Sequence, residues 1–593
     1  MKQAQIAVLD TGGQYCHLIA RKVRELGVSS EVFPSDVPLE QIQSAQGIII
    51  SGGPHSVYDA DSPRVQQPVL TAGIPVLGIC YGQQVLAHQL GGEVRPGNKG
   101  EYGLAFLDLL NVQSDVLRGV RDHQQIWMSH RDTVVAPPPG FNVLATTATC
   151  QIAAIEDPVR HLHAVQFHPE VVHTTEGIRI LNNFVFAICG CTKDWNAGER
   201  VSLVEEQIRQ CVGDRRVFFF VSGGVDSTVA FTLCLRALGA DRVHGVYVDT
   251  GLMREGETEF VERTFEKLGH GVVEIERAEA EFLTPLAMAR DPEQKRHIIG
   301  EQFVKVQERV IESRGLLAGG WLLGQGTIYP DTIESGGPNP GMGQAATIKT
   351  HHNRVPGIQK LMETGRIVEP LADFYKDEVR AIGRQLNLPA ELLDRHPFPG
   401  PGLAIRCLCS ETEQEVTRVP DGWLVPVRSV GVQGDFRTYA PVLAIERRPS
   451  FAARLQDEAP ELVNRIRGIN RVIATAASRQ PLERQRVFAS TIALARLDLL
   501  RRADAIVREL CDTSGFENKV WQFPVILIPL GTEDAPDSVV LRPVDSVDGM
   551  TAQSVVMDLV LLEKICREVL QVPGVAGVFY DLTHKPPGTI EWE

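Results

Sequence analysis

The sequence FFFVSGGVDS, residues 218–227, joins an apolar run to two glycines and a turn rich in hydroxyl groups. Residues 217–221 are all apolar, which predicts a buried parallel strand, and residues 228–238 have the apolar spacing of a helix. A helix that starts directly after such a strand presents unpaired backbone N–H groups, and these groups bind anions. The glycines allow the backbone to approach a phosphate group without an intervening Cβ atom. The stretch therefore predicts a phosphate-binding loop in an α/β fold.

The loop differs from the most common nucleotide-binding loop. The pattern GxxxxGK[ST] requires a lysine after the glycines, and none follows Gly223 and Gly224. SGGVDS instead resembles the loop of the ATP pyrophosphatases. That resemblance implies that the loop holds the β,γ-pyrophosphate of ATP and leaves the α-phosphorus open to attack. The alternative is a glycine-rich turn without a ligand, which the complete SGGxDS string disfavours.

The composition indicates a globular protein of several domains. The chain has 593 residues, of which 43% are hydrophobic and 22% charged, so we expect three or four domains. The net charge is −15 and no Lys/Arg run is present, which argues against a nucleic-acid partner. We find no signal-peptide pattern and no apolar stretch of about 18 residues, so we expect a cytoplasmic protein without a membrane span. The 11 cysteines are scattered, as in reduced proteins, and the close pairs Cys189/Cys191 and Cys407/Cys409 lack the further Cys/His pairs of a zinc site.

The first 190 residues contain the pattern of a cysteine nucleophile. Residues 5–9, 47–50 and 74–79 read as buried strands that alternate with helices, which predicts a parallel sheet. The third strand ends in GICYG, residues 78–82, with Cys80 where a nucleophile elbow places its reactive residue. The sharp turn exposes the sulfur, and the following helix N-terminus favours the thiolate. Cys80 is therefore a candidate nucleophile, and core packing is the alternative for a cysteine considered alone.

A base for Cys80 is found in QFHPE, residues 166–170. Residues 162–167 read as a strand, after which His168 can accept the thiol proton and Glu170 can orient His168. GICYGQQ together with QFHPE resembles the class I glutamine amidotransferases over residues 1–193. The resemblance implies that Cys80 attacks the side-chain amide of glutamine and releases ammonia. It also implies an oxyanion hole and a glutamine site formed by Gly53, Tyr81, Gln84, Ser129, His130 and Asp132.

Further motifs surround the phosphate loop. Residues 334–345, ESGGPNPGMGQA, are rich in Gly and Pro and lead to Lys349, which suggests a lid that closes over phosphates; an incidental lysine on a surface loop is the alternative. ADFYKDEVR (372–380) and RHPFPGPGLAIR (395–406) follow in order. With the final stretch YDLTHKPPGTIEWE (580–593), nearly the whole chain resembles the glutamine-hydrolysing GMP synthetases.

This resemblance implies a reaction and its site residues. XMP, activated by ATP through an adenylyl-XMP intermediate, would take ammonia from glutamine to give GMP, AMP and pyrophosphate. The implied ATP residues are Ser222, Gly223, Gly224, Val225, Asp226, Ser227, Thr228, Val248, Leu252, Gln325, Lys349 and Lys376. The implied XMP residues are Arg296, Asp435, Arg437, Gln522, Lys585, Ile590 and Glu591, and the implied Mg²⁺ ligands are Asp226 and Asp377.

The last third of the chain contains an internal repeat. A strand–strand–helix–strand pattern begins at residue 423 and again at residue 521. We therefore expect a class I amidotransferase α/β domain (1–193), a Rossmann-like ATP pyrophosphatase domain (194–408) and two α+β copies (409–505 and 506–593). Paired copies within one chain would make the enzyme a monomer; a homodimer is the alternative.

Two other functions are compatible with parts of this pattern. One is another amidotransferase with an ATP pyrophosphatase domain, such as an NAD synthetase or a tRNA-modifying thiolase. The other is an inactive scaffold that only binds nucleotide. The −15 charge disfavours an RNA substrate, and the complete set Cys80, His168 and Glu170 disfavours a scaffold.

Overall fold

The computed structural model divides the chain into two compact units, Met1–Ala197 (unit 1) and Gly198–Glu593 (unit 2). The residues that it describes are 4–13, 15–110, 113–267, 273–317, 320–329, 358, 360–361, 364–396, 398–433, 436–446, 452–466, 468–546 and 552–593. The predicted lid (334–345), Lys349 and Asp435 lie outside these residues, as does the side chain of Arg437.

Unit 1 is built on a nine-stranded mixed sheet. Its five parallel strands, in spatial order, are β2 (Ser30–Pro34), β1 (Ile6–Asp10), β3 (Gly47–Ile50), β4 (Val76–Ile79) and β9 (Leu162–Val165). Four antiparallel strands extend it: β8 (Ala154–Asp157), β7 (Asn142–Thr146), β5 (Glu93–Leu109) and β6 (Gln124–Ala136). The helices are α1 (Cys16–Glu25), α2 (Leu39–Ile42), α3 (Gln67–Thr71), α4 (Tyr81–Gln89), α5 (Gly177–Asn182) and the π-helix η1 (Asn183–Ile188).

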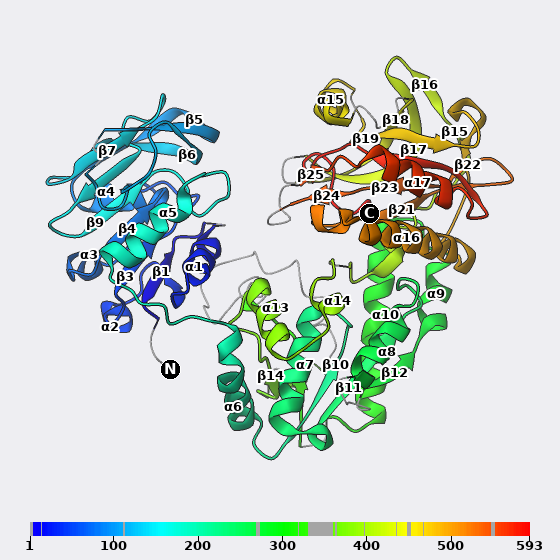
Figure 1. Cartoon of the computed structure of the whole chain (residues 1–593), viewed down its shortest axis with the longest axis horizontal. Helices are drawn as coiled ribbons and strands as arrows, with labels where there is room; N and C mark the ends of the chain where they lie inside the picture. Colours follow the sequence, from blue (N-terminus) through cyan, green and yellow to red (C-terminus); the bar gives the residue numbers. More distant parts are fainter. Residues whose placement is uncertain are drawn as a thin grey trace. The chain divides into compact units, whose positions relative to one another are not determined.

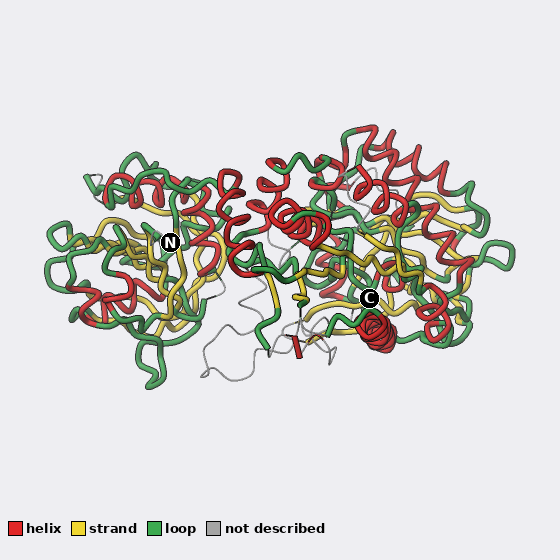
Figure 2. Tube along the Cα trace, turned by 90° about the horizontal axis from the view of Figure 1, so that it is seen from below, coloured by secondary structure: helices red, strands yellow, loops and turns green. Residues whose placement is uncertain are grey.

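Both faces of this sheet are buried, as the continuous apolar runs predict. Ile6 and Val8 belong to one hydrophobic cluster, whereas Ala7 and Leu9 belong to another. Because side chains alternate along a strand, the two clusters lie on opposite faces of the sheet. Figure 2 shows helices on both sides of the strands of unit 1. The arrangement confirms the predicted α/β fold.

The first part of unit 2 is a five-stranded parallel sheet. The strand order is β12 (Val273–Arg277), β11 (Val243–Asp249), β10 (Arg216–Phe220), β13 (Trp321–Gly324) and β14 (Ile367–Val368). The helices of this part are α6 (Val201–Val212), α7 (Val225–Leu238), α8 (Glu257–Lys267), α9 (Glu279–Leu286), α10 (Pro292–Ser313), α13 (Lys376–Gln385) and α14 (Ala390–Leu393) (Figure 1). The central strand β10 is the one that the opening motif predicts, and α7 begins three residues before the predicted helix.

The second part of unit 2 contains both repeats in a single seven-stranded sheet. The first repeat supplies β17 (Gly422–Gln433), β18 (Phe436–Ile445), α15 (Ala452–Arg465) and β19 (Arg471–Ser478), with β16 (Thr417–Val419) at the edge. The second repeat supplies β21 (Val525–Ile528), β23 (Asp537–Leu541), α17 (Leu559–Val569) and β26 (Val575–Asp581). The remaining elements are α16 (Leu494–Ser514), the short strands β15 (Gln414–Glu415), β20 (Arg486–Val487), β22 (Leu530–Gly531), β24 (Val544–Asp545) and β25 (Gln553–Ser554), and 3₁₀ turns at Gly198–Arg200, Ala240–Arg242, Gly402–Ile405, Leu482–Arg484 and Phe516–Lys519.

The two repeats have the same strand arrangement on either side of the central pair β19 and β26. In the first repeat β17 is antiparallel to β18, and β18 is parallel to β19. In the second repeat β21 is antiparallel to β23, and β23 is parallel to β26. The innermost strands β19 and β26 pair antiparallel, with Ile473 opposite Asp581 and Thr475 opposite Phe579. The two copies are therefore related by a pseudo-two-fold axis between β19 and β26, in one chain.

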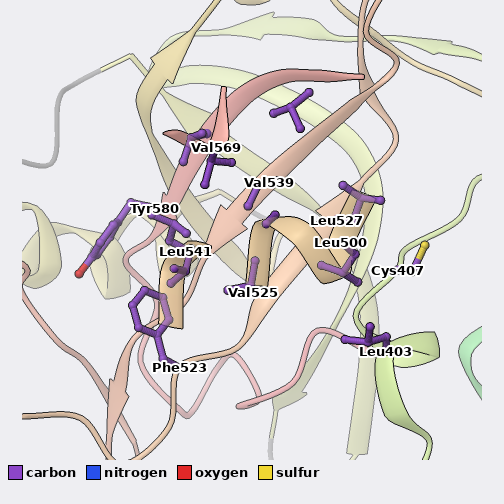
Figure 3. Packing of buried hydrophobic residues seen from close by; sticks show 14 of the residues in the cluster. Leu403, Cys407, Leu500, Phe523, Val525, Leu527, Val539, Leu541, Val569 and Tyr580 are labelled. Carbon is purple, nitrogen blue, oxygen red and sulfur yellow. The ribbon is translucent and has the colours of Figure 1, made fainter. Parts of the chain in front are cut away.

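One hydrophobic cluster continues through both parts of unit 2. It includes Phe282 of α9 and Leu403 near the ATP part, and Leu500, Leu541 and Tyr580 of the repeats. Figure 3 shows Leu403 and Cys407 on the same side of the cluster as Leu500 of α16 and Leu527 of β21. A shared core of this kind explains why residues 198–593 form one compact unit.

Several boundaries differ from the sequence expectation. The compact units divide after residue 197 rather than after 193, and the expected boundary between 505 and 506 falls inside α16. Among the described helices, none is both long and apolar enough to cross a bilayer.

Candidate active site

Cys80 lies in the sharp turn between β4 and α4. Its φ of 52° and ψ of −105° are rare for a residue with a side chain, as in a nucleophile elbow. The flanking glycines are required by close backbone contacts. A Cβ atom on Gly82 would lie 2.4 Å from the main-chain oxygen of Ile50, and one on Gly78 would lie 2.6 Å from that of Gly82. The G-x-C-x-G spacing is thus a steric condition for placing the sulfur at the end of the strand.

His168 and Glu170 follow β9, which pairs with β4. The Nδ1 atom of His168 lies 2.7 Å from Oε1 of Glu170, and both side chains are buried. Gly52 borders both Cys80 and His168: a Cβ atom there would lie 3.0 Å from Cε1 of His168 and 3.4 Å from Cβ of Cys80. The structure therefore brings together the three residues that the sequence selects as nucleophile, base and orienting carboxylate. The ring of Tyr15, which the sequence did not single out, packs edge-on against His168 at 5.1 Å between centroids.

The charge state of His168 is set by its neighbours. Burial is the strongest influence and disfavours the charged imidazolium, but Glu170 and Cys80 together outweigh it and raise the pKa of His168 to about 10. At neutral pH the proton is therefore held on the imidazole beside the Cys80 sulfur. The protonated ring can then act as a general acid toward a leaving amine.

The predicted glutamine-site residues lie around Cys80 on β6 and α4. The Cys80 sulfur lies 3.5 Å from the main-chain oxygen of Ser129. The Gln84 amide donates to the main-chain oxygen of Asp132 at 2.8 Å, and the Asp132 carboxylate accepts from Ser56 Oγ at 2.5 Å. The side chain of His130 turns toward Glu101, with 3.3 Å between Nε2 and Oε2. The main chain of this strand therefore borders the thiol, while its polar side chains contact other protein groups.

Two further predicted residues complete the surroundings of Cys80. Tyr81 follows it as the first residue of α4, and its hydroxyl donates to the main-chain oxygen of Pro63 at 2.9 Å. Gly53 lies against Thr11, whose main-chain oxygen would be 2.6 Å from a Cβ atom on Gly53.

The SGGVDS loop connects β10 to α7 as predicted. Ser222 Oγ and Ser227 Oγ lie 2.9 Å apart, and Ser222 Oγ also accepts from the backbone N–H of Gly224 at 3.3 Å. Gly223 has a φ of 73°, a conformation that favours glycine. Thr228 Oγ1 donates to the main-chain oxygen of Gly224 at 2.8 Å, and Val225 is the first residue of α7. The loop is thus closed on itself at the N-terminus of a helix, a position suited to an anion.

Two segments far away in sequence lie against this loop. Nζ of Lys376, at the start of α13, is 3.2 Å from Oδ2 of Asp226. Gly326 packs on the loop so closely that a Cβ atom there would lie 2.8 Å from Ser227 Cα. Gln325 precedes Gly326, and Asp377 follows Lys376, so each is the sequence neighbour of a residue that contacts the loop. Leu252 and Val248 belong instead to the hydrophobic cluster of unit 2, Leu252 as a buried member and Val248 as a partly buried one.

The C-terminal residues that the sequence assigns to XMP are held by buried cations. The Arg406 guanidinium binds both carboxylate oxygens of Glu591, at 2.9 and 2.7 Å. Arg296 donates to a main-chain oxygen of Glu593, and Lys295 binds the Glu593 carboxylate at 2.6 Å. Arg296 and Glu591 are thus attached to the same C-terminal segment.

The other XMP candidates lie on the segments around that tail. Ile590 accepts a bond from Arg542 Nε at 2.9 Å through its main-chain oxygen. Lys585 pairs with Ala552, and Gln522 pairs with Val544, through main-chain bridges.

The sequence analysis missed the cations that organise this region. Arg471 and Arg542 both bind Oδ2 of Asp581, at 2.9 and 2.7 Å, and all three side chains are fully buried. Lys295, Arg406 and Arg542 were not predicted to have a role. For Arg406 and Arg542 a signal exists, since each is a lone charge in an apolar run (GLAIRCL and SVVLRPV). Lys295 has no comparable signal.

Comparisons with known proteins agree with this division of the chain. Residues 7–188 match the family described as glutamine amidotransferase class-I, residues 197–296 match NAD synthase, and residues 509–592 match the GMP synthase C terminal domain. A probable GMP synthase (glutamine-hydrolyzing) from Leptospira interrogans serovar copenhageni is 42% identical over 610 residues, which cover 99% of each chain. The chain belongs to the glutamine-hydrolysing GMP synthase family.

Other members of the GMP synthase family match with similar coverage. The GMP synthase of Symbiobacterium thermophilum is 40% identical over 599 residues, 99% of each chain, and that of Syntrophomonas wolfei is 38% identical over 603 residues, 100% of each chain. The chain therefore converts XMP to GMP, with ATP as co-substrate and glutamine as nitrogen donor, in guanine nucleotide biosynthesis. The match to NAD synthase is confined to the ATP region, so the NAD synthetase alternative is not supported.

Proposed function

We propose that Cys80, His168 and Glu170 release ammonia from glutamine in unit 1. The observation that carries this proposal is the Cys80 elbow beside a buried His168–Glu170 pair. Cys80 attacks the side-chain amide carbon of glutamine, and His168 donates its proton to the departing ammonia. The thioester that remains is hydrolysed by water, with His168 now acting as the base. The backbone N–H groups of Gly53 and Tyr81 are proposed to stabilise the oxyanion, and Gln84, Ser129, His130 and Asp132 to form the glutamine site.

In unit 2 we propose that the Ser222–Thr228 loop holds the pyrophosphate half of ATP. The XMP C2 oxygen attacks the α-phosphorus, the bond to the β,γ-pyrophosphate breaks, and adenylyl-XMP forms. Adenylylation turns the C2 oxygen into a good leaving group, so that ammonia displaces AMP and gives GMP. The N–H groups of the loop and the ammonium group of Lys376 offset the charge on the departing pyrophosphate. Val248, Leu252 and Gln325 are proposed to surround the nucleoside, and Lys349 to reach the phosphates.

The residues beside the loop also fit a magnesium ion. Oδ1 of Asp226 is a buried carboxylate oxygen without a hydrogen-bond partner among the described residues, and Mg²⁺ prefers such oxygen ligands. Asp226 and Asp377 would hold the ion. When bound, it would draw charge from the phosphate oxygens of ATP.

XMP is proposed to bind at the C-terminal segment. Arg296 and Lys585 supply positive charge for its phosphate, and Gln522, Ile590 and Glu591 contact the purine and ribose. Asp435 and Arg437 are proposed to contribute from the first repeat. Arg296 donates to Glu593, and the buried Arg406 binds Glu591, so the C-terminal tail is the element that would position XMP.

Replacing Glu170 by glutamine tests the unit 1 proposal through pH. The carboxylate helps to raise the pKa of His168 to about 10, so its loss should lower that pKa. The active imidazolium is lost as pH rises through the pKa of His168, so the alkaline limb of the glutaminase pH profile should move to lower pH. We expect kcat for glutamine hydrolysis to fall by about 10²–10⁴-fold at neutral pH, because the imidazole is also less well oriented. The measurement is ammonia release between pH 6 and 10. An unchanged alkaline limb would show that Glu170 does not set the charge of His168.

We further propose that the active enzyme is a cytoplasmic monomer. Pairing of β19 with β26 gives each repeat its partner within one chain. Sedimentation of the enzyme during turnover should therefore give a mass near 65.2 kDa. A mixture of the Lys585→Ala and Lys376→Met chains should show no more ammonia-dependent activity than the two give separately. Activity confined to a species of twice that mass, or recovery of activity in the mixture, would contradict the monomer.

A further inference from the structure

We propose that unit 1 binds a zinc ion between Glu101, His130 and Cys150. Glu101 and His130 lie opposite each other on β5 and β6, and Cys150 lies in the connection from β7 to β8. One ligand atom from each residue lies within 4.8 Å of those from the other two. His130 and Cys150 are buried, and Glu101 is half-buried. This candidate ion is separate from the Mg²⁺ proposed for unit 2.

When the His130 ring is neutral, its hydrogen bonding leaves an acceptor facing an acceptor. Its Nδ1 lies 3.0 Å from the main-chain oxygen of Asp132, which can only accept, so Nδ1 carries the hydrogen. In the neutral ring Nε2 then holds a lone pair, and it faces Oε2 of Glu101 at 3.3 Å. Both atoms are buried and have no hydrogen-bond partner among the described residues. A cation between them satisfies both lone pairs.

The His130–Glu101 distance and the donor types fit zinc. Two Zn²⁺ bonds of about 2.0 Å at the tetrahedral angle separate their ligand atoms by about 3.3 Å, the spacing of His130 Nε2 and Glu101 Oε2. A sulfur, a nitrogen and a carboxylate oxygen together favour Zn²⁺ over Mg²⁺ or Ca²⁺. Three protein ligands leave a fourth position for water. This set is not recognisable from the sequence, because its members lie about 20 to 50 residues apart and do not form zinc-motif pairs.

The groups around the three ligands hold them in place. Thr147 Oγ1 donates to Oε1 of Glu101 at 3.2 Å, which leaves Oε2 directed at His130. The same Thr147 oxygen accepts from the backbone N–H of Cys150 at 2.9 Å, so one hydroxyl connects two of the ligands. Outer contacts of this kind orient metal ligands. Burial raises the pKa of the Cys150 thiol, so zinc binding should release a proton.

The ion would fix the strand that borders the nucleophile. His130 follows Ser129, whose main-chain oxygen lies 3.5 Å from the Cys80 sulfur. A bound zinc would tie β5 and β6 to the β7–β8 connection at that point. Its proposed role is structural, since no ligand atom is itself in contact with Cys80 in the described residues.

Metal analysis of the full chain tests the proposal. The test uses untagged Cys80→Ala protein, because Cys80 and His168 could themselves bind zinc. After one equivalent of Zn²⁺ and desalting, we expect about one Zn per chain by mass spectrometry of the element. Cobalt(II) in its place should give a near-ultraviolet thiolate-to-metal absorption band. In the same background, Cys150→Ser should abolish the band and lower zinc retention by about tenfold or more.

The controls separate a site from loss of fold. Cys191→Ser removes another buried thiol of unit 1 and should retain both zinc and the cobalt band. Glu101→Gln keeps the size of the side chain and should weaken zinc binding while the thiolate band with cobalt persists at higher metal concentration. Less than about 0.1 Zn per chain without a cobalt band, or zinc retained equally by Cys150→Ser, would overturn the proposal. His130 and Glu101 would then be a protonated imidazolium–carboxylate pair.

Discussion

Replacement of Cys80 by alanine is expected to abolish GMP formation from glutamine and to preserve GMP formation from ammonia. The alanine chain has no nucleophile for the glutamine amide, so glutamine-dependent kcat should fall by at least about 10³-fold. Unit 2 is a separate compact unit with its own core, so XMP activation should continue. With a high concentration of ammonium salt at pH 8.5, the rate should stay within about twofold of the unchanged enzyme. The measurement follows loss of XMP absorbance together with AMP release, with each nitrogen source in turn.

The matched control is Cys191→Ser, which changes a buried thiol of the same unit away from the elbow. This variant should form GMP from glutamine and from ammonia at unchanged rates. Loss of both activities in Cys80→Ala, with Cys191→Ser intact, would mean that Cys80 maintains the structure rather than attacking glutamine. Retention of glutamine-dependent activity in Cys80→Ala would exclude it as the nucleophile.

Replacement of Lys376 by methionine is expected to abolish most GMP formation and to preserve glutamine hydrolysis, which is the opposite of the effect expected for Cys80→Ala. Its ammonium group lies 3.2 Å from Asp226 in the SGGVDS loop, where the pyrophosphate would leave. Without that charge, GMP formation should fall by about 10²–10³-fold with glutamine and with ammonia alike. Basal glutamine hydrolysis should continue, because Cys80, His168 and Glu170 are unchanged. Steady-state GMP formation and ammonia release are measured on the same preparation.

The control for Lys376 is Lys305→Met, which removes an exposed lysine of α10 in the same unit. Lys305→Met should leave all rates within about twofold. If Lys376→Met lowered only glutamine-dependent GMP formation, Lys376 would not act on the ATP step. Partial recovery by Lys376→Arg would indicate that charge rather than shape is required.

The parts of the site that could be predicted are those fixed by local steric conditions. The glycines around Cys80 are required by contacts within a few ångströms, and Gly223 adopts a conformation that favours glycine. Such requirements leave a short pattern in the sequence, and the elbow and the phosphate loop lie where it predicts them. The strands of both parallel sheets are recognisable for a similar reason, since their burial on both faces demands continuous apolar runs.

The parts that could not be predicted depend on partners far apart in sequence. Arg471 meets Asp581 across 110 residues and Lys295 meets Glu593 across 298. The identity of a charged residue does not determine whether its side chain will be exposed or paired in the interior. The extent of α16 was missed because the repeat pattern placed a boundary where one helix continues. The same limit applies to Glu101, His130 and Cys150, which only the folded strands bring together.

The pairing of β19 with β26 has a consequence for how the two halves can change over time. In a homodimer made from one such repeat, each substitution is present on both sides of the axis. Here the two sides are encoded separately, and they already differ: Arg471 begins β19 of the first repeat, whereas the second repeat has Gly577 at the corresponding position. One half can therefore keep the groups that meet a substrate while the other becomes a support for them. Because the repeats are covalently joined, the active-site residues of one repeat need not be repeated in the other.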